Sequence, residues 1–143
     1  PGSGVNVVIS SATLTSAKVD GAADVEITGV RGENFLLQSD GSGSTRIREL
    51  GVNRVQLSTT GSGGIQAEGR AKLGTYVVGG SGSIDAKRLT VENASIAVGG
   101  SGSAYADARK TANVSVNGSG EVEVVGGATC TRQPSNSRRI ACR

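Results

Sequence analysis

The sequence has no tryptophan, no methionine and no histidine, and only three of its 143 residues are aromatic. Large side chains are therefore too few to build a conventional globular core, so the core must consist of small aliphatic and β-branched residues. Residues of this size suit thin layers that repeat along an axis. The lack of histidine and the presence of only two cysteines argue against zinc sites and the common nucleophile triads.

The chain also lacks a long hydrophobic run and a strong excess of one charge. No stretch of about 18 apolar residues occurs, so we expect no membrane-spanning helix. The net charge of +3 comes from 15 basic and 12 acidic residues, with mixed signs along the repeats. The excess lies in the tail, at Arg132, Arg138, Arg139 and Arg143. Because no basic stripe alternates with aromatic residues, nucleic acid is not an expected partner.

Glycine, in contrast, is abundant at 23 residues, and much of it belongs to one repeated signal. Five Gly-Ser-Gly triplets recur at intervals of 18 to 20 residues, and earlier copies begin near Gly21 and Gly2. A fixed period of this length is typical of a stacked solenoid, whose coils bury their apolar faces only against one another, and about seven coils fit the chain. The turn glycines are Gly41, Gly43, Gly61, Gly63, Gly80, Gly82, Gly100, Gly102, Gly118 and Gly120.

Each coil contains two segments in which every second residue is small or apolar, the pattern of a half-buried strand. After the turn, the predicted inward positions are Val25, Ile27, Thr45, Ile47, Ile65, Ala67, Ile84, Ala86, Ala104, Ala106, Val122 and Val124. Before the turn, they are Phe35, Leu37, Ser39, Val55, Leu57, Thr59, Gly74, Tyr76, Val78, Ala94, Ile96, Val98, Ala112, Val114 and Val116. A weaker third side recurs at Val30, Leu50, Val52, Leu89 and Val91.

Strands that repeat in the same direction in every coil must pair in parallel. We therefore predict an all-β, parallel β-helix-like solenoid of about seven coils, each of 18–20 residues with two to three short strands. Right-handed winding is expected, because parallel crossovers are right-handed in nearly all proteins. One lap of this perimeter encloses a single layer of side chains, so no cofactor is expected inside.

The residue between the two inward positions of the first strand is polar or large in every coil. These residues are predicted to form a row on the outer surface, the candidate binding face, made of Glu26, Arg46, Gln66, Asp85, Tyr105 and Glu123. The glycines are assigned to corners where the backbone turns sharply on top of its neighbour, since Gly adopts positive φ without a Cβ clash. The serine between them is expected to hydrogen-bond the local backbone and close the turn.

No catalytic, cofactor-binding or metal site is predicted. The segment from Gly79 to Asp85 resembles the calcium-binding nonapeptide repeat, but Asp85 comes one place too late and the period does not match. Its counterparts Arg46, Gln66 and Tyr105 cannot supply a row of carboxylates. The acidic residues lie far apart in register, so we interpret them as solvated surface charge.

Cys130 and Cys142 enclose a polar segment of eleven residues. Without metal-ligating neighbours they predict a disulfide, which implies an oxidising compartment, and a pair of free thiols is the alternative. The chain is accordingly divided into a β-solenoid domain over residues 1–127 and a disulfide-closed tail over 128–143, packed on the last coil. Because the chain begins at Pro1 without a visible signal peptide, we expect it to be processed or trimmed.

The segment from Val78 to Ala86, with Leu89 and residues 94–102, resembles the head GIN domain, a family associated with autotransporter adhesins and formerly a domain of unknown function. That family is marked by serial Gly-Ser-Gly turns between short strands, and the likeness runs over residues 21–127. The resemblance implies a β-helix-like body that is exported to the bacterial periplasm or cell surface, with no established catalytic residues. This chain departs from the pattern in its Cys-bounded tail and at Arg46, Gln66 and Tyr105.

Three functions are consistent with these observations. The first is a non-enzymatic, exported, adhesin-like binding or structural module whose partner is a glycan or an envelope component, because flat repeated faces favour extended ligands. The second is a polysaccharide-active enzyme, which would need two carboxylates that converge in a groove. The third is a self-assembling homo-oligomeric rod whose end strands pair between molecules.

Overall fold

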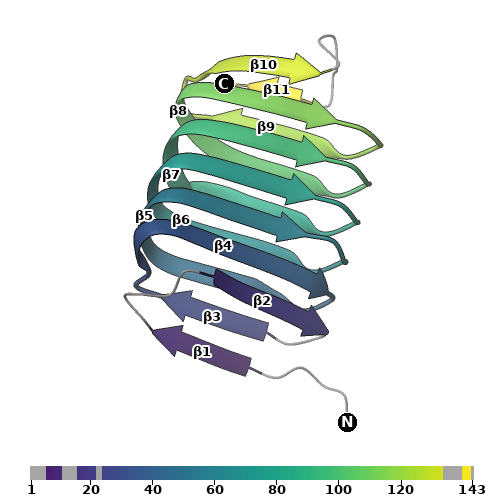
Figure 1. Cartoon of the computed structure of the whole chain (residues 1–143). Coiled ribbons are helices and arrows are strands. Elements are labelled where there is room, and N and C mark those ends of the chain that lie inside the picture. The colour runs from purple at the N-terminus through teal and green to yellow at the C-terminus, as the bar shows by residue number, and fades with distance from the viewer. Residues whose placement is uncertain (1–5, 11–15, 22–23, 134–139, 143) are drawn as a thin grey trace.

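The computed structural model describes residues 6–10, 16–21, 24–133 and 140–142, and the regular structure in these residues is entirely β-strand. Each strand pairs in parallel with a strand one lap away, and the laps stack into a rod of about six turns, close to the seven predicted (Figure 1). The predicted β-solenoid is confirmed. The strands are β1 (Asn6–Ser10), β2 (Ser16–Gly21), β3 (Asp24–Thr28), β4 (Arg31–Gly41), β5 (Thr45–Thr59), β6 (Gly64–Val78), β7 (Ser83–Val98), β8 (Ser103–Val116), β9 (Glu121–Val125), β10 (Thr129–Gln133) and β11 (Ile140–Cys142).

Two walls face each other across the core. The first wall consists of β1, β3, the N-terminal halves of β5 to β8, β9 and β11, and the second consists of β2, β4, the C-terminal halves of β5 to β8 and β10. In Figure 1 the nearer strands run to the right and the farther ones to the left while the chain climbs towards its C-terminus, so the winding is right-handed. The Gly-Ser-Gly turns join the walls along one edge, called the turn edge. A bend within β5 to β8 joins them along the other.

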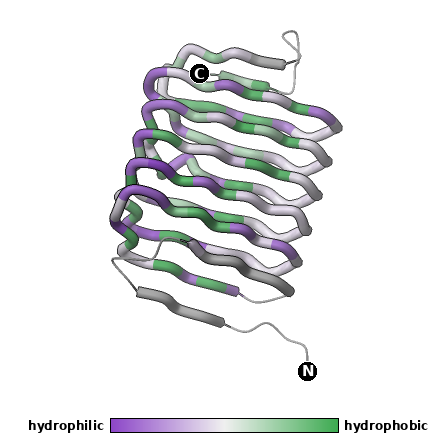
Figure 2. The backbone as a smooth tube through the Cα atoms, in the orientation of Figure 1, coloured by the Kyte–Doolittle hydropathy of each residue, from purple (hydrophilic) through white to green (hydrophobic). Residues whose placement is uncertain are grey.

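The core is built from rows of residues that lie one lap apart. Ile65 pairs in register with Ile84, and Ile84 with Ala104, so the three side chains stack in one interior row. All the inward positions predicted for the two strands and the third side are buried. Burying an aliphatic side chain of this size contributes about 1.5–3 kcal/mol, and a single lap cannot achieve it alone. Figure 2 shows the resulting alternation of hydrophobic and hydrophilic residues along the strands of the middle laps.

The turn edge is held together by contacts between backbones. A Cβ atom built on Gly82 would lie 2.0 Å from the carbonyl oxygen of Gly63, and one on Gly102 would lie 2.0 Å from that of Gly82. The amide of Gly82 donates to the carbonyl of Gly61 at 3.1 Å, and the amide of Gly102 donates to that of Gly80 at 3.1 Å. Side chains are therefore excluded because each turn lies directly on the turn of the previous lap.

This geometry corrects the predicted reason for the turn glycines. Of the ten, only Gly41 and Gly118 have positive φ, at 137° and 148°. From Gly61 onwards the others are required by close approach to the lap below and not by backbone conformation. The central serine of each turn is exposed, and the hydrogen bonds that close the turns run between backbone groups of successive laps.

The bend is made by irregular pairing instead of by a loop. Register shifts occur between Ile47 and Leu50 in β5 and between Gln66 and Glu68 in β6. Glu49 adopts a φ of 56°, and a Cβ on Gly69 would lie 2.1 Å from the carbonyl oxygen of Leu50. Extra residues of this kind bend a strand and increase its twist, which lets one long strand serve both walls.

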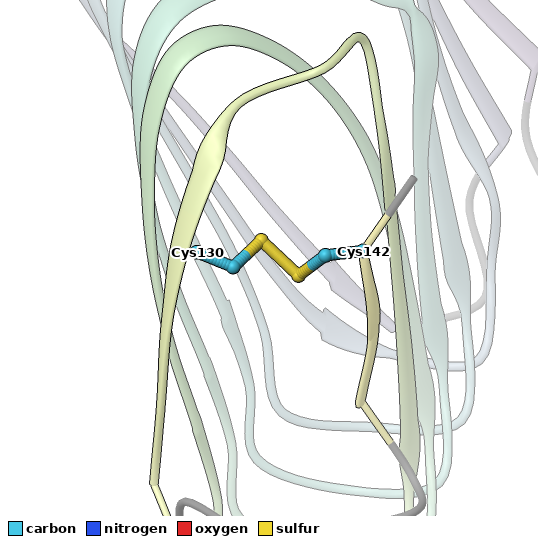
Figure 3. The surroundings of a disulfide bond; sticks show 2 residues. All are labelled: Cys130 and Cys142. Atoms are coloured by element: carbon cyan, nitrogen blue, oxygen red, sulfur yellow. A yellow bond between two sulfur atoms is a disulfide. The ribbon is translucent and has the colours of Figure 1, made fainter.

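The two cysteines form the predicted disulfide, which bridges the walls at the C-terminal end of the rod (Figure 3). Cys130 of β10 pairs in register with the buried Ala112, and Cys142 of β11 pairs with the buried Val124. Both cysteines pack against the core with their Cα atoms 6.4 Å apart. The bridge therefore ties the last strand of each wall to the other, and closing a loop of this length is worth about 3 kcal/mol.

We predict that Gly82→Ala lowers the free energy of unfolding by about 2–4 kcal/mol, because a methyl group cannot fit against the Gly63 carbonyl without separating the laps. Gly79→Ala is the matched control, since a Cβ there meets nothing closer than 3.6 Å. The control should change stability by less than about 1 kcal/mol. Denaturant unfolding of both variants measures the difference, and equal midpoints would contradict the steric explanation.

Candidate binding surface

The structure places the six residues of the candidate binding face in one continuous row on the outside of the first wall. Each is the register partner of the next, one lap further along the rod. Successive laps are about 4.8 Å apart, so the row extends for roughly 24 Å. The row is Glu26, Arg46, Gln66, Asp85, Tyr105 and Glu123, and we call it the ladder face.

Side chains along the ladder face interact from lap to lap. Arg46 donates from Nε to Oε1 of Gln66 at 3.2 Å. Further along, Lys87 Nζ lies 2.8 Å from Oε1 of Glu123 and 4.9 Å from the centre of the Tyr105 ring. The hydrogen bond to Glu123 raises the pKa of the Lys87 ammonium above its ordinary value. The carboxylates of this face are thus partly neutralised by neighbouring cations, as surface charges usually are.

Lys87 can reach two laps onward because the next lap is shorter. The interval from Gly100 to Gly118 is 18 residues, whereas that from Gly80 to Gly100 is 20. In the pairing of β7 with β8, Ala86 opposes Ala106 and the next matched pair is Thr90 with Asp107. Residues 87–89 consequently have no register partner in β8, and the Lys87 side chain crosses this gap onto Tyr105.

Two depressions flank the middle of the ladder face. One of about 220 Å³ is lined by residues of the ladder that include Arg46, Gln66, Asp85 and Tyr105. The other, of about 330 Å³, lies nearer the bend and shares Gln66 and Asp85 with the first. Tyr105 is half-buried, while the other two aromatic side chains, Phe35 and Tyr76, are buried in the core. The depressions offer an aromatic ring beside groups that donate and accept hydrogen bonds.

The outside of the second wall differs from the ladder face in the charge of its central side chains. Its central row includes Leu36, Gln56, Thr75, Ser95 and Asn113, each paired in register with the next. These side chains are uncharged, and no ion pair joins them among the residues that the structure describes. This wall therefore provides a matched surface on which control substitutions can be placed.

Two buried polar side chains, Asp107 and Tyr76, border the core. Asp107 is 8% exposed, and its carboxylate pairs with Arg109, with 3.2 Å between Oδ1 and Nε and 3.3 Å between Oδ2 and Nη2. The fully buried Tyr76 hydroxyl has no hydrogen-bond partner among the described residues. It lies where a Cβ on Gly74 would be, at 2.5 Å, so the glycine makes room for the phenol. Burial raises the pKa of Tyr76 well above its ordinary value, and the Asp107 charge adds to the rise.

In the described part of the chain, no three His, Cys, Asp or Glu side chains are grouped as metal ligands. The same residues contain no helix that is long and apolar enough to cross a membrane.

The structure brings the six predicted residues of the ladder face together as one extended surface. The disulfide and the turn glycines lie apart from it. The contact between Lys87, Tyr105 and Glu123 was not predicted. Its one signal in the sequence is the shortened 18-residue interval.

Residues 1–128 match the family model described as "Putative auto-transporter adhesin, head GIN domain". The chain belongs to the head GIN domain family. A solved structure described as a "putative adhesin" from Bacteroides fragilis NCTC 9343 has a similar fold, with a TM-score of 0.79 and 21% sequence identity. The likeness covers 91% of this chain and 59% of that one, so this head GIN domain spans about three fifths of the neighbour's length. No curated protein matches the sequence.

The buried Tyr76 leads to a prediction about alkaline unfolding. Its folded-state pKa lies above the unfolded value of about 10, so its stabilising contribution is complete below that pH and is lost as the pH rises towards the folded pKa. In a Tyr105→Phe variant, Tyr76 is the only tyrosine. Its phenolate absorbance should appear together with the loss of the β-sheet circular dichroism signal. Titration near pH 10 with the fold intact would contradict the burial of the hydroxyl.

Proposed function

We propose that this head GIN domain is an exported, non-enzymatic module of the periplasm or cell surface, which binds an extended partner through its ladder face. Membership of an adhesin-associated family supports a role at the surface. The disulfide supports export, because such bonds persist in oxidising compartments.

The observation that carries the proposal is the ladder face itself. It presents one side chain per lap over six consecutive laps, and it is flanked by two depressions of about 330 Å³ and 220 Å³. A linear partner such as a polysaccharide can follow such a row, because its own repeats can contact successive laps. Tyr105 offers a ring against which an apolar sugar face can stack, beside the Arg46, Gln66 and Asp85 side chains.

The charged groups of the ladder face fit binding better than hydrolysis. Glu123 is paired with Lys87, and Glu68, at the border with the bend, is shared between Arg48 and Arg88 at 4.0 Å and 3.5 Å. Both carboxylates are engaged by cations of the protein, whereas glycoside hydrolysis needs two carboxyl groups that face the substrate. We therefore assign these carboxylates to the binding surface.

The test is binding of the purified protein to a glycan array and to bacterial envelope fractions. We predict that Tyr105→Ala weakens binding roughly fivefold to tenfold, equivalent to about 1–1.5 kcal/mol. Asn113→Ala is the control, because Asn113 is exposed on the same strand, β8, but on the second wall. Its affinity should equal that of the unmodified protein. If neither glycan nor envelope is bound, or if the two variants weaken binding equally, the ladder face is not the binding surface.

A further inference from the structure

The solenoid separates charges that are mixed along the sequence. Ten Lys and Arg residues and eleven Asp and Glu residues lie between Asp24 and Thr131. Nine of the ten bases, but only five of the eleven acids, fall in the bend segments, which are residues 29–33, 48–54, 68–72, 87–92 and 107–110. Outside them, Arg46 is the single base beside six acids. The outward side chains of the bend segments therefore form a basic edge, the bend face, and Figure 2 shows hydrophilic residues recurring there in successive laps.

Part of the bend face is neutralised internally. Arg48 and Arg88 share Glu68, Lys110 lies 3.6 Å from Glu92, and Arg109 pairs with Asp107. Four bases remain. They are exposed, and none of them has an ion pair or a side-chain hydrogen bond to another described residue: Arg31, Arg54, Arg70 and Lys72.

Three of these four bases lie around one depression. Gly51 is the register partner of Arg31 in the lap before it and of Arg70 in the lap after it. The Arg31 side chain extends over Gly51, since a Cβ there would lie 3.3 Å from Nη1. A depression of about 360 Å³ is lined by Gly51, Arg70 and Lys72, together with Glu92, which is paired with Lys110. Cationic groups from the first and third of three consecutive laps thus lie on either side of Gly51, which contributes no side chain of its own to the floor.

We propose that the bend face is a binding site for a carboxylate-bearing polysaccharide that lies along the rod, with one carboxylate seated over Gly51 between Arg31 and Arg70. Arg31 and Arg70 are two laps apart, about 10 Å between backbones, so their long side chains can both reach an anion at the midpoint. A guanidinium group pairs with a carboxylate through two parallel hydrogen bonds. Lys72, two residues from Arg70 on the same lap, pairs with a neighbouring carboxylate of the polymer. This site is separate from the ladder face and does not depend on the function proposed for it.

Two other polyanions fit the bend face less well. Nucleic acid binding uses aromatic side chains on which bases stack, and the aromatic residues of this chain are buried or lie on the ladder face. Binding to a lipid surface requires an apolar face as well as charge. Among the described residues, the only large apolar side chains that are exposed are Leu36 and Leu73. A linear acidic polysaccharide needs neither feature.

The experiment is calorimetric titration with polygalacturonate, a polymer that carries one carboxylate per sugar, and with uncharged dextran. Polygalacturonate should bind at low salt and weaken strongly at about 0.3 M salt, while dextran should not bind. Arg70→Gln should reduce the affinity roughly threefold to tenfold, and the combined Arg31→Gln, Arg70→Gln and Lys72→Gln variant should abolish measurable binding. These residues are exposed, so circular dichroism should show an intact fold for each variant.

Arg46→Gln is the matched control, because it removes the same charge from the ladder face. It should leave polygalacturonate affinity within about twofold. Equal weakening by Arg46→Gln and Arg70→Gln would overturn the location, since net charge alone would then explain binding. Dextran binding equal to that of polygalacturonate would overturn the ionic mechanism. Tighter binding to duplex DNA or to vesicles of anionic phospholipid would overturn the assignment to polysaccharide. A Tyr105→Ala variant should bind polygalacturonate normally, which separates this site from the ladder face.

Discussion

Neighbouring laps of backbone are one parallel hydrogen-bond spacing apart, about 4.8 Å, and every other feature of the rod must fit that distance. At the turn edge nothing larger than hydrogen fits between the backbone of Gly82 and the carbonyl of Gly63. In the interior, the same spacing brings Ile65, Ile84 and Ala104 into contact and supplies the burial that no single lap could provide. The disulfide between the walls then ties the last strands of the stack together.

The same spacing determines how the protein can meet a partner. Any outward position is repeated in every lap, so a surface takes the form of a row along the rod and not of a pocket. The ladder face carries mixed charges and one half-buried aromatic ring, whereas the bend face carries an excess of cations. The site at Lys87 and Tyr105 arises where the repeat is broken by a shorter lap, so specific chemistry is located at an irregularity in an otherwise uniform scaffold.

Much of the fold could be predicted from the sequence, because a period near 20 residues fixes which positions share a row. From this period even Tyr76 and Gly74 were assigned correctly to the core, although neither resembles the residues at the same position in other laps. The reason for the glycines was only partly predicted, since the distance between laps at Gly82 is a property of the stacked structure. The basic bend face was missed as well. Arg31 and Arg70 are 39 positions apart along the chain, and alternating charges conceal an edge that forms only when the laps are stacked.

The most direct test of this account is the excision of one whole lap, residues 61–79, which joins Thr60 to the turn that begins at Gly80. If laps are interchangeable layers held by their neighbours, the shortened protein should unfold cooperatively with an unchanged type of β-sheet spectrum and a smaller denaturant dependence. Excision of residues 61–70 removes half a lap, puts the inward rows out of register and should prevent folding. If the whole-lap variant fails to fold as completely as the half-lap variant, successive laps are not equivalent stacked units.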